Sequence, residues 1–211
     1  MTAYRKILIV TAVNAEADAL RGAIDPELAS VEAVGVGPAA AAVGTARLLA
    51  RGDHRAVLSA GIAGGFVGRA EVGGTVLGTR SIAADLGAES PEGFLPIEEL
   101  GFGTSVLESD PVLVKALRAA LPTAVTGDVL TLSTVTGTAA TAAALATRFP
   151  EAAAEAMEGY GVATAASTFG LPFAELRTIS NAIGPRDRSA WRLAEAFAAL
   201  RTAGEALSRL T

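Results

Sequence analysis

Cysteine is absent from this sequence, which excludes a disulfide framework, a thiolate metal site and a cysteine nucleophile. Histidine occurs once, at His54, between Asp53 and Arg55 in a polar connection. A histidine in such a setting is more typical of a solvated loop than of a catalytic centre. With one histidine, a zinc site or a His-based triad is nearly excluded. We therefore expect no metal and no cofactor.

Positive charge is also scarce. The chain has 17 lysines and arginines against 22 acidic residues, a net charge of −5, with no basic tract. Nucleic-acid binders present a clustered positive face, usually with aromatic residues, and only three residues here are tyrosine or tryptophan. We expect no nucleic-acid partner.

Long hydrophobic runs are missing too. Glycines, threonines and charges interrupt the alanine-rich segments, so no uncharged run is long enough to span a bilayer. The first apolar run, residues 7–10, is too short for a signal-peptide core, and polar residues soon follow it. We expect a cytoplasmic protein with no membrane partner.

What remains is the composition of an ordinary folded chain, 51% apolar and 18% charged. A chain of 211 residues buries a substantial core, and one domain is the default at this length. Residues 1–211 are therefore expected to form a single domain.

The most informative stretch is an apolar run from Ala56 that ends in Gly61, Gly64 and Gly65. Glycine suits positions where the backbone takes positive φ or where a ligand approaches the main chain closely. An apolar strand followed by a glycine turn is a common place for a small-molecule site in an open α/β sheet. The same pattern also fits a tight connection between two elements, so this stretch alone leaves both interpretations open.

Along the whole chain, strand and helix signals alternate in the order expected of an α/β sandwich: three layers, with a central mixed sheet flanked by helices. Strands are predicted at 7–11, 31–36, from 56 into the glycine turn, and at 73–82, 124–133 and 173–180. Helices are predicted from Asn14, a possible cap, to about 20, and at 39–50, 111–120, 138–147, 152–169 and 190–210. Residues 84–103 read as a long surface excursion.

Several polar features have structural explanations as good as functional ones. Glu16 lies in the first turn of its expected helix, where a negative charge favours the helix macrodipole. The turn at 35–38 offers free N–H groups to an anion, but it lacks the third glycine of a dinucleotide fingerprint. The hydroxyl-rich segment 131–138 fits either loop capping or the lining of a sugar pocket.

Glu158, placed inside the helix predicted over 152–169, has no basic partner at Val162, four residues later. Gly159 and Gly161 follow it, and each costs roughly 1 kcal/mol in a helix interior. We expect close packing or a bound ligand to account for both glycines.

Four of these pieces, in this order and spacing, resemble the nucleoside phosphorylase and nucleosidase superfamily, and its hydrolase branch in particular. The similarity to 5′-methylthioadenosine/S-adenosylhomocysteine nucleosidases runs from Ile7 to about Leu207. It implies a nucleoside phosphorylase-like fold, a small purine nucleoside substrate and a homodimer or higher homo-oligomer. The four pieces are Glu16, residues 59–65, the pair Met157–Glu158, and residues 177–181.

The resemblance also implies roles for individual residues. Glu16 would be the general base for the attacking water, Met157 and Glu158 would hold the ribose, and Arg177 would help to order the site. The remaining implied residues are the segment that wraps the purine, Val135 and Thr136, and the turn beside the water, Ile62, Ala63 and Gly64.

Three departures from the pattern point away from adenine nucleosides. Ile62 replaces a serine of the turn and Ala156 replaces an acidic residue, which puts the adenosine-type hydrogen bonds in doubt. Asn181 replaces a base-binding and catalytic carboxylate. A carboxylate accepts from the 6-amino group of adenine, whereas a carboxamide donates to O6 of a 6-oxopurine and accepts the proton developing on N7. An unpaired polar group costs roughly 1–3 kcal/mol, enough to set base choice by tens-fold.

With segments 133–138 and 179–181, the chain is similar to the futalosine hydrolases of menaquinone biosynthesis, which release hypoxanthine from futalosine and leave dehypoxanthinyl futalosine. The resemblance thus implies an N-glycosyl hydrolase. The alternatives are another purine nucleosidase or phosphorylase, of the inosine or methylthioadenosine/S-adenosylhomocysteine type, and a nucleoside-binding module without catalysis. Phosphorolysis needs clustered cations, and none follows Arg55 into the glycine stretch, which favours water.

Overall fold

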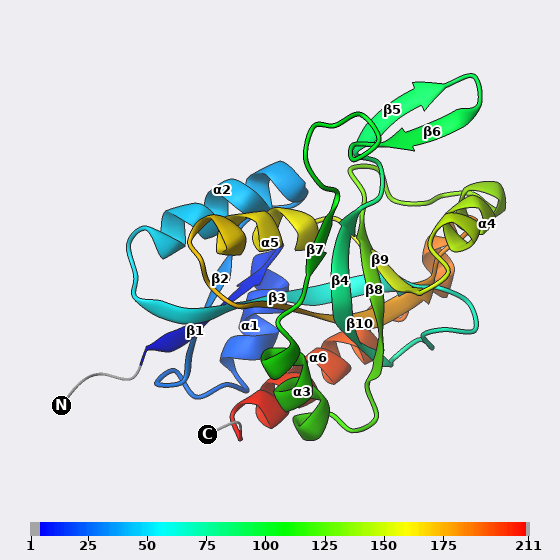
Figure 1. Cartoon of the computed structure of the whole chain (residues 1–211). Coiled ribbons are helices and arrows are strands. Elements are labelled where there is room, and N and C mark those ends of the chain that lie inside the picture. Colours follow the sequence, from blue (N-terminus) through cyan, green and yellow to red (C-terminus); the bar gives the residue numbers. More distant parts are fainter. Residues whose placement is uncertain (1–4, 210–211) are drawn as a thin grey trace.

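The computed structural model describes residues 5–209. A mixed β-sheet runs through the middle of the molecule, with helices packed on both of its faces (Figure 1). Strands β1 to β4 span Lys6–Thr11, Ala29–Ala33, His54–Gly65 and Thr75–Ala83, and β7 to β10 span Val106–Glu108, Val125–Thr131, Ala152–Ala156 and Phe173–Ala182. Helices α1 to α6 span Asn14–Arg21, Pro38–Leu49, Pro111–Ala120, Ala139–Arg148, Gly159–Thr168 and Leu193–Leu207.

The strands follow the order β10-β4-β8-β9-β3-β1-β2, and β7 adds to the edge of β4. Strand β3 pairs with β1, β9 and also β10, so that β10, β4, β8, β9 and β3 form a closed circuit of pairings. Its long pairing with β10 is parallel, while its short pairing with β9 is antiparallel. The predicted α/β architecture with a central mixed sheet is therefore confirmed, and part of that sheet is wrapped on itself.

The core is divided by the sheet. On one face, α1, α3 and α6 pack against the sheet through aliphatic side chains such as Leu20, Leu117 and Leu200. On the other face, α2 and α5 bury Ala41, Val162 and their neighbours against β1 and β3. Both layers of helices are visible in Figure 1, which shows α2 beside α5 on one side and α6 on the other.

The helix predicted over 152–169 is wrong in its first part. Residues Ala152–Ala156 form the strand β9, which pairs with β8 and β3 and is buried along its whole length. Helix α5 begins only at Gly159. Alanine favours helix, but here small side chains suit a strand enclosed between two others, so tertiary packing overrides propensity.

The surface excursion also contains more order than predicted. Strands β5 (Gly87–Ser90) and β6 (Gly93–Pro96) form a hairpin that projects from one end of the molecule (Figure 1). The other expected helices and strands are present with shifted ends. Of the last helix predicted, residue 210 lies outside the described part of the chain, and a 3₁₀ turn at Arg188–Ala190 precedes α6.

Two smaller expectations fail. His54 is not a loop residue, because it opens β3, half-buried, with its Nε2 3.2 Å from the Ser30 hydroxyl. Asn14 does not cap α1; the carboxylate of Glu16 instead accepts from the backbone N–H groups of Ala12 and Val13. Within residues 5–209, no helix combines the length and the apolar character that crossing a bilayer requires.

Gly161→Ala should destabilise the fold. The two helices α2 and α5 touch at this glycine, where an added Cβ would come within 3.0 Å of the Pro38 backbone. Overpacking of this kind costs about 1–3 kcal/mol, which urea unfolding would measure. The matched control is Gly22→Ala, because Gly22 has φ −70° and an added Cβ there would meet its nearest atom at 3.6 Å. That control should keep or slightly raise stability, and equal losses in both variants would contradict the close packing.

Candidate active site

A cavity of about 640 Å³ opens where β1, β3, β9 and β10 reach their carboxyl ends. Ligand sites in open α/β sheets favour this edge, since the loops that follow the strands converge there. Nine of the ten residues expected in the site line this one cavity: Glu16, Ile62, Ala63, Gly64, Val135, Thr136, Met157, Glu158 and Asn181. They come from segments up to 165 residues apart, counting from 16 to 181, so the fold alone gathers them.

The glycine stretch does not form a turn. Ile62, Ala63 and Gly64 all belong to β3, and Gly61, Gly64 and Gly65 lack the positive φ that a turn glycine adopts. The prediction of a turn is therefore wrong, and the groups that come close to Gly61 in the structure are two side chains of the protein. An added Cβ at Gly61 would lie 2.7 Å from Oε1 of Glu16 and 3.0 Å from Nη1 of Arg177.

Glu16 is held in place by backbone donors from two elements. Its Oε2 accepts from the N–H groups of Ala12 and Val13 at 3.0 and 3.2 Å, and its Oε1 accepts from Ile62 N–H at 2.9 Å. The residue is 5% exposed. Three N–H donors fix this carboxylate at the cavity wall, which is an arrangement suited to orienting a polar ligand or water.

Glu158 lies at the junction between β9 and α5 rather than inside a helix. Its Oε1 accepts from Gly37 N–H at 3.1 Å, and its Oε2 lies 3.6 Å from Nη1 of Arg177. The partner that the sequence lacked at position 162 is thus supplied by distant segments. At the turn before α2, whose N–H groups suit an anion or a polar ligand atom, the Gly37 N–H is occupied by the Glu158 carboxylate.

Arg177, the tenth expected residue, lies behind the cavity wall and is 1% exposed. Its Nε donates to Oε1 of Glu175 at 2.9 Å and its Nη2 donates to the Ser59 hydroxyl at 3.0 Å. Burial acts to lower the pKa of Arg177, but the carboxylates of Glu175, Glu158 and Glu16 raise it above the ordinary value. The guanidinium therefore remains charged and holds Glu158 by ion pairing.

Glu175 is a buried partner that sequence reasoning missed. It is 0% exposed, and burial raises the pKa of its carboxyl, although Arg177 opposes this effect. Gly159 makes the room for it, because an added Cβ there would come within 3.0 Å of both Glu175 carboxyl oxygens. The expectation that close packing explains Gly159 and Gly161 is confirmed.

Asn181 lies near the end of β10, half-buried, at the cavity. Its Oδ1 accepts from the Ser180 hydroxyl at 2.8 Å and its Nδ2 donates to Ala182 O at 2.9 Å. Each of the two amide atoms retains one further hydrogen-bonding position. The side chain can therefore offer one donor and one acceptor to a ligand at the same time.

Glu155 was also missed, because the sequence placed it in a helix. It is 5% exposed, lines the cavity, and its Oε1 accepts from Thr136 N–H at 2.7 Å. The Thr136 hydroxyl donates to Oε2 of the same carboxyl. Burial raises the pKa of Glu155, while these two hydrogen bonds act in the opposite direction. The sequence signal that could have identified Glu155 is its place in a short apolar run before Met157, followed closely by two glycines that disfavour helix.

The outer wall of the cavity comes from the loop after β10 and from α6, whose residues no sequence motif marked. Trp191 lies here, with the guanidinium carbons of Arg186 and Arg188 at 5.6 and 5.8 Å from its ring centre. Within residues 5–209, no cluster of three or more His, Cys, Asp or Glu side chains is arranged to hold a metal ion.

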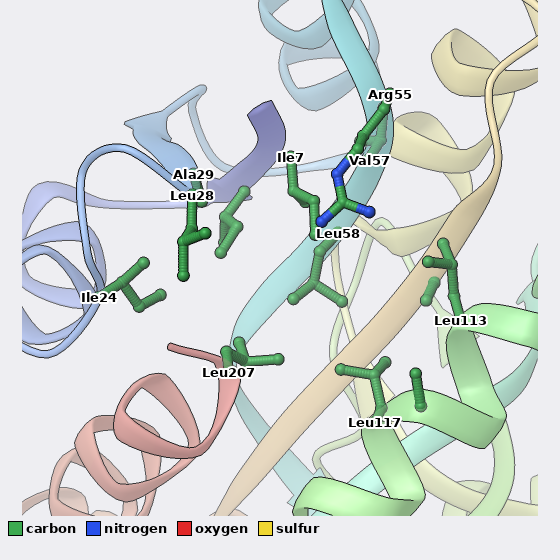
Figure 2. Close-up of a pocket in the computed structure, with 13 residues that line it drawn as sticks. Ile7, Ile24, Leu28, Ala29, Arg55, Val57, Leu58, Leu113, Leu117 and Leu207 are labelled. Carbon is green, nitrogen blue, oxygen red and sulfur yellow. The ribbon is translucent and has the colours of Figure 1, made fainter. Parts of the chain in front are cut away.

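A second cavity, of about 50 Å³, lies at the opposite end of β3 (Figure 2). Its walls are aliphatic, with Leu58, Leu117 and Leu207 around it, and Arg55 supplies a guanidinium. Among residues 5–209, its lining includes no carboxylate, hydroxyl or amide side chain that could take part in acid–base chemistry. The larger cavity is therefore the candidate active site.

Comparisons with known proteins all point to one enzyme superfamily. A sequence model of the phosphorylase superfamily matches residues 7–211. The futalosine hydrolase of Streptomyces coelicolor is 47% identical over 215 residues, covering 92% of this chain and 91% of that protein. The futalosine hydrolase of Acidothermus cellulolyticus is 46% identical over 220 residues, which cover 92% of this chain and 90% of that protein.

Among solved structures, the native futalosine hydrolase of Helicobacter pylori superposes with a TM-score of 0.83 over 98% of this chain and 97% of that chain. At 18% identity, this likeness shows the fold alone. The chain belongs to the phosphorylase superfamily and, within it, to the futalosine hydrolase family.

Replacing Glu175 by glutamine should remove a pH dependence of stability. Burial raises the folded-state pKa of Glu175 above 4.5, so the folded protein binds this proton more tightly and loses stability as the pH rises through that raised pKa. Relative to the wild type, Glu175→Gln should gain stability above about pH 5, by up to about 1.4 kcal/mol per pH unit.

Urea unfolding at intervals between about pH 5 and 8 measures this difference. Glu205→Gln, on the exposed face of α6, is the control and should follow the wild-type curve. Parallel curves for Glu175→Gln and the wild type would show that the buried carboxyl does not titrate as described.

Proposed function

We propose that this protein hydrolyses the N-glycosidic bond of futalosine, releasing hypoxanthine and dehypoxanthinyl futalosine, as a step of menaquinone biosynthesis. The observation that carries the proposal is that Glu16 and Asn181 line one cavity, together with Met157 and Glu158, in a chain 46–47% identical to two futalosine hydrolases. A carboxylate and an amide are thus available to opposite ends of one purine–sugar bond.

The mechanism follows from the charge that develops as this bond breaks. The sugar becomes positive at C1′ and the purine becomes negative. The site must therefore stabilise a purine that takes up a proton, and it must position a water molecule to attack C1′. The purine takes a proton from solvent at N7, where the Asn181 carbonyl accepts that N–H while its NH2 group donates to O6, and the water oxygen bonds to C1′ as the bond to the base breaks. Glu16, held by three backbone N–H groups, orients the water and takes its proton.

The ribose is the part of the substrate assigned to Met157 and Glu158. Glu158 is fixed by Gly37 and Arg177, so its carboxylate is already oriented before a ribose hydroxyl donates to it. Met157 supplies an adaptable apolar surface beside the sugar. Val135 and Thr136 lie along the base, and Ile62, Ala63 and Gly64 lie beside the water.

Water is favoured over phosphate as the nucleophile. A phosphate dianion needs cations that are free to bind it. Arg177 is buried and divided among carboxylates, and Arg55 lies at the opposite end of β3, in the second cavity. Arg186 does line the cavity, from the loop after β10. Its backbone N–H donates to Gly137 O, which places this residue beside the segment assigned to the base rather than to the nucleophile.

We further propose that the chain acts as one domain, in the cytoplasm, and as a homodimer or larger homo-oligomer. Support for assembly comes from the open side of the cavity, where Val36 is 55% and Val67 81% exposed. Exposed apolar side chains at the mouth of a site are typical of a surface that another subunit covers.

The direct test is incubation of the purified protein with futalosine, with and without phosphate, followed by chromatography for free hypoxanthine. Equal release in both conditions is expected of a hydrolase. Release that requires phosphate would indicate a phosphorylase, and binding without any release would indicate a nucleoside-binding module.

Glu16→Gln should lower kcat for hypoxanthine release by about 10²–10⁴-fold, because the amide cannot take a proton from water. Unfolding curves should show a folded protein with a loss of roughly 1–3 kcal/mol, because the carbonyl oxygen of the amide serves the donors on one side while its NH2 group faces an N–H donor on the other. The control is Asp18→Asn on the exposed side of the same helix, which should keep wild-type turnover. Near wild-type kcat in Glu16→Gln would remove Glu16 as the base.

Asn181→Asp should shift base preference from hypoxanthine toward adenine. A carboxylate faces O6 with lone pairs only, whereas it accepts from a 6-amino group. We expect the ratio of kcat/KM for futalosine to that for its 6-amino counterpart to fall by tens-fold. An unchanged ratio would contradict the role of Asn181 in reading the base.

A further inference from the structure

Glu155 is a buried carboxyl in the candidate active site that the mechanism above leaves without a role. It lines the same cavity as Asn181 and is 5% exposed. Unpaired buried carboxyls are costly, so a carboxyl retained in a ligand cavity needs partners. Thr136 supplies two of them, its backbone N–H and its hydroxyl.

Glu155 and Asn181 stand in one row across the sheet. In the pairing of β9 with β3, Glu155 is opposite Gly64, and in the pairing of β10 with β3, Asn181 is opposite the same Gly64. A bulge in β10 lies between Ile179 and Asn181, and an added Cβ at Gly64 would lie 3.5 Å from Nδ2 of Asn181. Glu155, Gly64 and Asn181 all line the cavity, so both side chains flank Gly64 on the cavity face. Neighbouring strands lie about 4.8 Å apart, which puts the two backbones about 10 Å from each other.

This separation suits the edge of a flat base. Along one edge of hypoxanthine the polar atoms are N7, then O6, then N1, and two hydrogen bonds of about 2.9 Å extend that edge on either side. Asn181 is placed to address N7 and O6. The next atom along the edge is N1, which carries a hydrogen in hypoxanthine and a lone pair in adenine.

The carboxyl of Glu155 has acceptor capacity left for that hydrogen. Thr136 N–H can only donate, so Oε1 accepts from it, and a carboxylate has about four lone-pair positions. The same contact also occupies Thr136 N–H, a donor that adenine N1 would otherwise accept from. This wall of the cavity therefore presents an acceptor where a 6-oxopurine carries a donor.

We propose that Glu155 accepts the N1–H of the 6-oxopurine, and so excludes adenine at the atom next to the two that Asn181 reads. This proposal rests on the proposed function, because it names a further base-reading residue in that site. It adds a second, independent selection: Asn181 distinguishes the 6-substituent, and Glu155 distinguishes the protonation of N1. A single substitution at either position leaves the other selection in place.

The test is Glu155→Gln, which keeps the size and a carbonyl for Thr136 N–H but presents an amide N–H to N1. Steady-state kinetics with futalosine and with its 6-amino counterpart give kcat/KM for each. We expect the futalosine to 6-amino ratio to fall at least tenfold. Glu151→Gln, at the exposed start of the same segment, is the matched control and should keep the wild-type ratio.

A binding measurement guards against a variant with disturbed chemistry. Trp191 is the only tryptophan of the chain and lines the cavity, so its fluorescence reports free bases that bind there. The dissociation constant of hypoxanthine should rise at least tenfold in Glu155→Gln, while that of adenine stays the same or falls.

Two outcomes would overturn the role of Glu155. If the ratio stays within twofold of the wild-type ratio, the carboxyl does not read N1. If both substrates lose activity equally and both bases bind more weakly, Glu155 merely anchors the Thr136 segment. Failure of the proposed function looks different, because the wild type itself would then release no hypoxanthine.

Discussion

The candidate active site depends on one buried guanidinium. Arg177 is enclosed by three carboxylates, those of Glu158 and Glu175 in ion pairs and that of Glu16 across Gly61. Removing the guanidinium would leave these carboxyls buried without compensation, a loss that typically costs about 3–5 kcal/mol. The arrangement therefore couples the base proposed for the water, Glu16, to the group proposed for the ribose, Glu158, although 142 positions separate 16 from 158 in the sequence.

Glycine is what lets these charges meet. Without side chains at Gly61 and Gly159, the sheet and helix α5 come close enough for Glu16, Arg177 and Glu175 to share one small volume. The glycine-rich segment thus serves packing around buried charges rather than a change of chain direction. Because the charged groups are held by the backbone and by each other, little reorganisation is needed when a substrate enters.

Sequence reasoning located most of the site because its residues follow the ends of apolar strands, where α/β proteins place their ligands. Glu16, Glu158 and Asn181 were predicted, and the cavity contains all three. Glu155 and Glu175 were missed for a physical reason: their importance lies in burial, and burial depends on pairing between distant strands. The alanine run before Met157 has a local preference for helix, which only its place between β8 and β3 reverses.

The closed circuit of strands has a consequence for how such a protein can change. A strand with neighbours on both sides has no free edge. The part of β3 around Gly64 therefore cannot shift relative to β9 and β10 without breaking backbone hydrogen bonds to both strands at once. Changes of structure and sequence are therefore easier in the segments after β8 and β10, which line the cavity. New substrates in this fold should therefore arise by exchange of those two loops, above a foundation that stays constant through divergence.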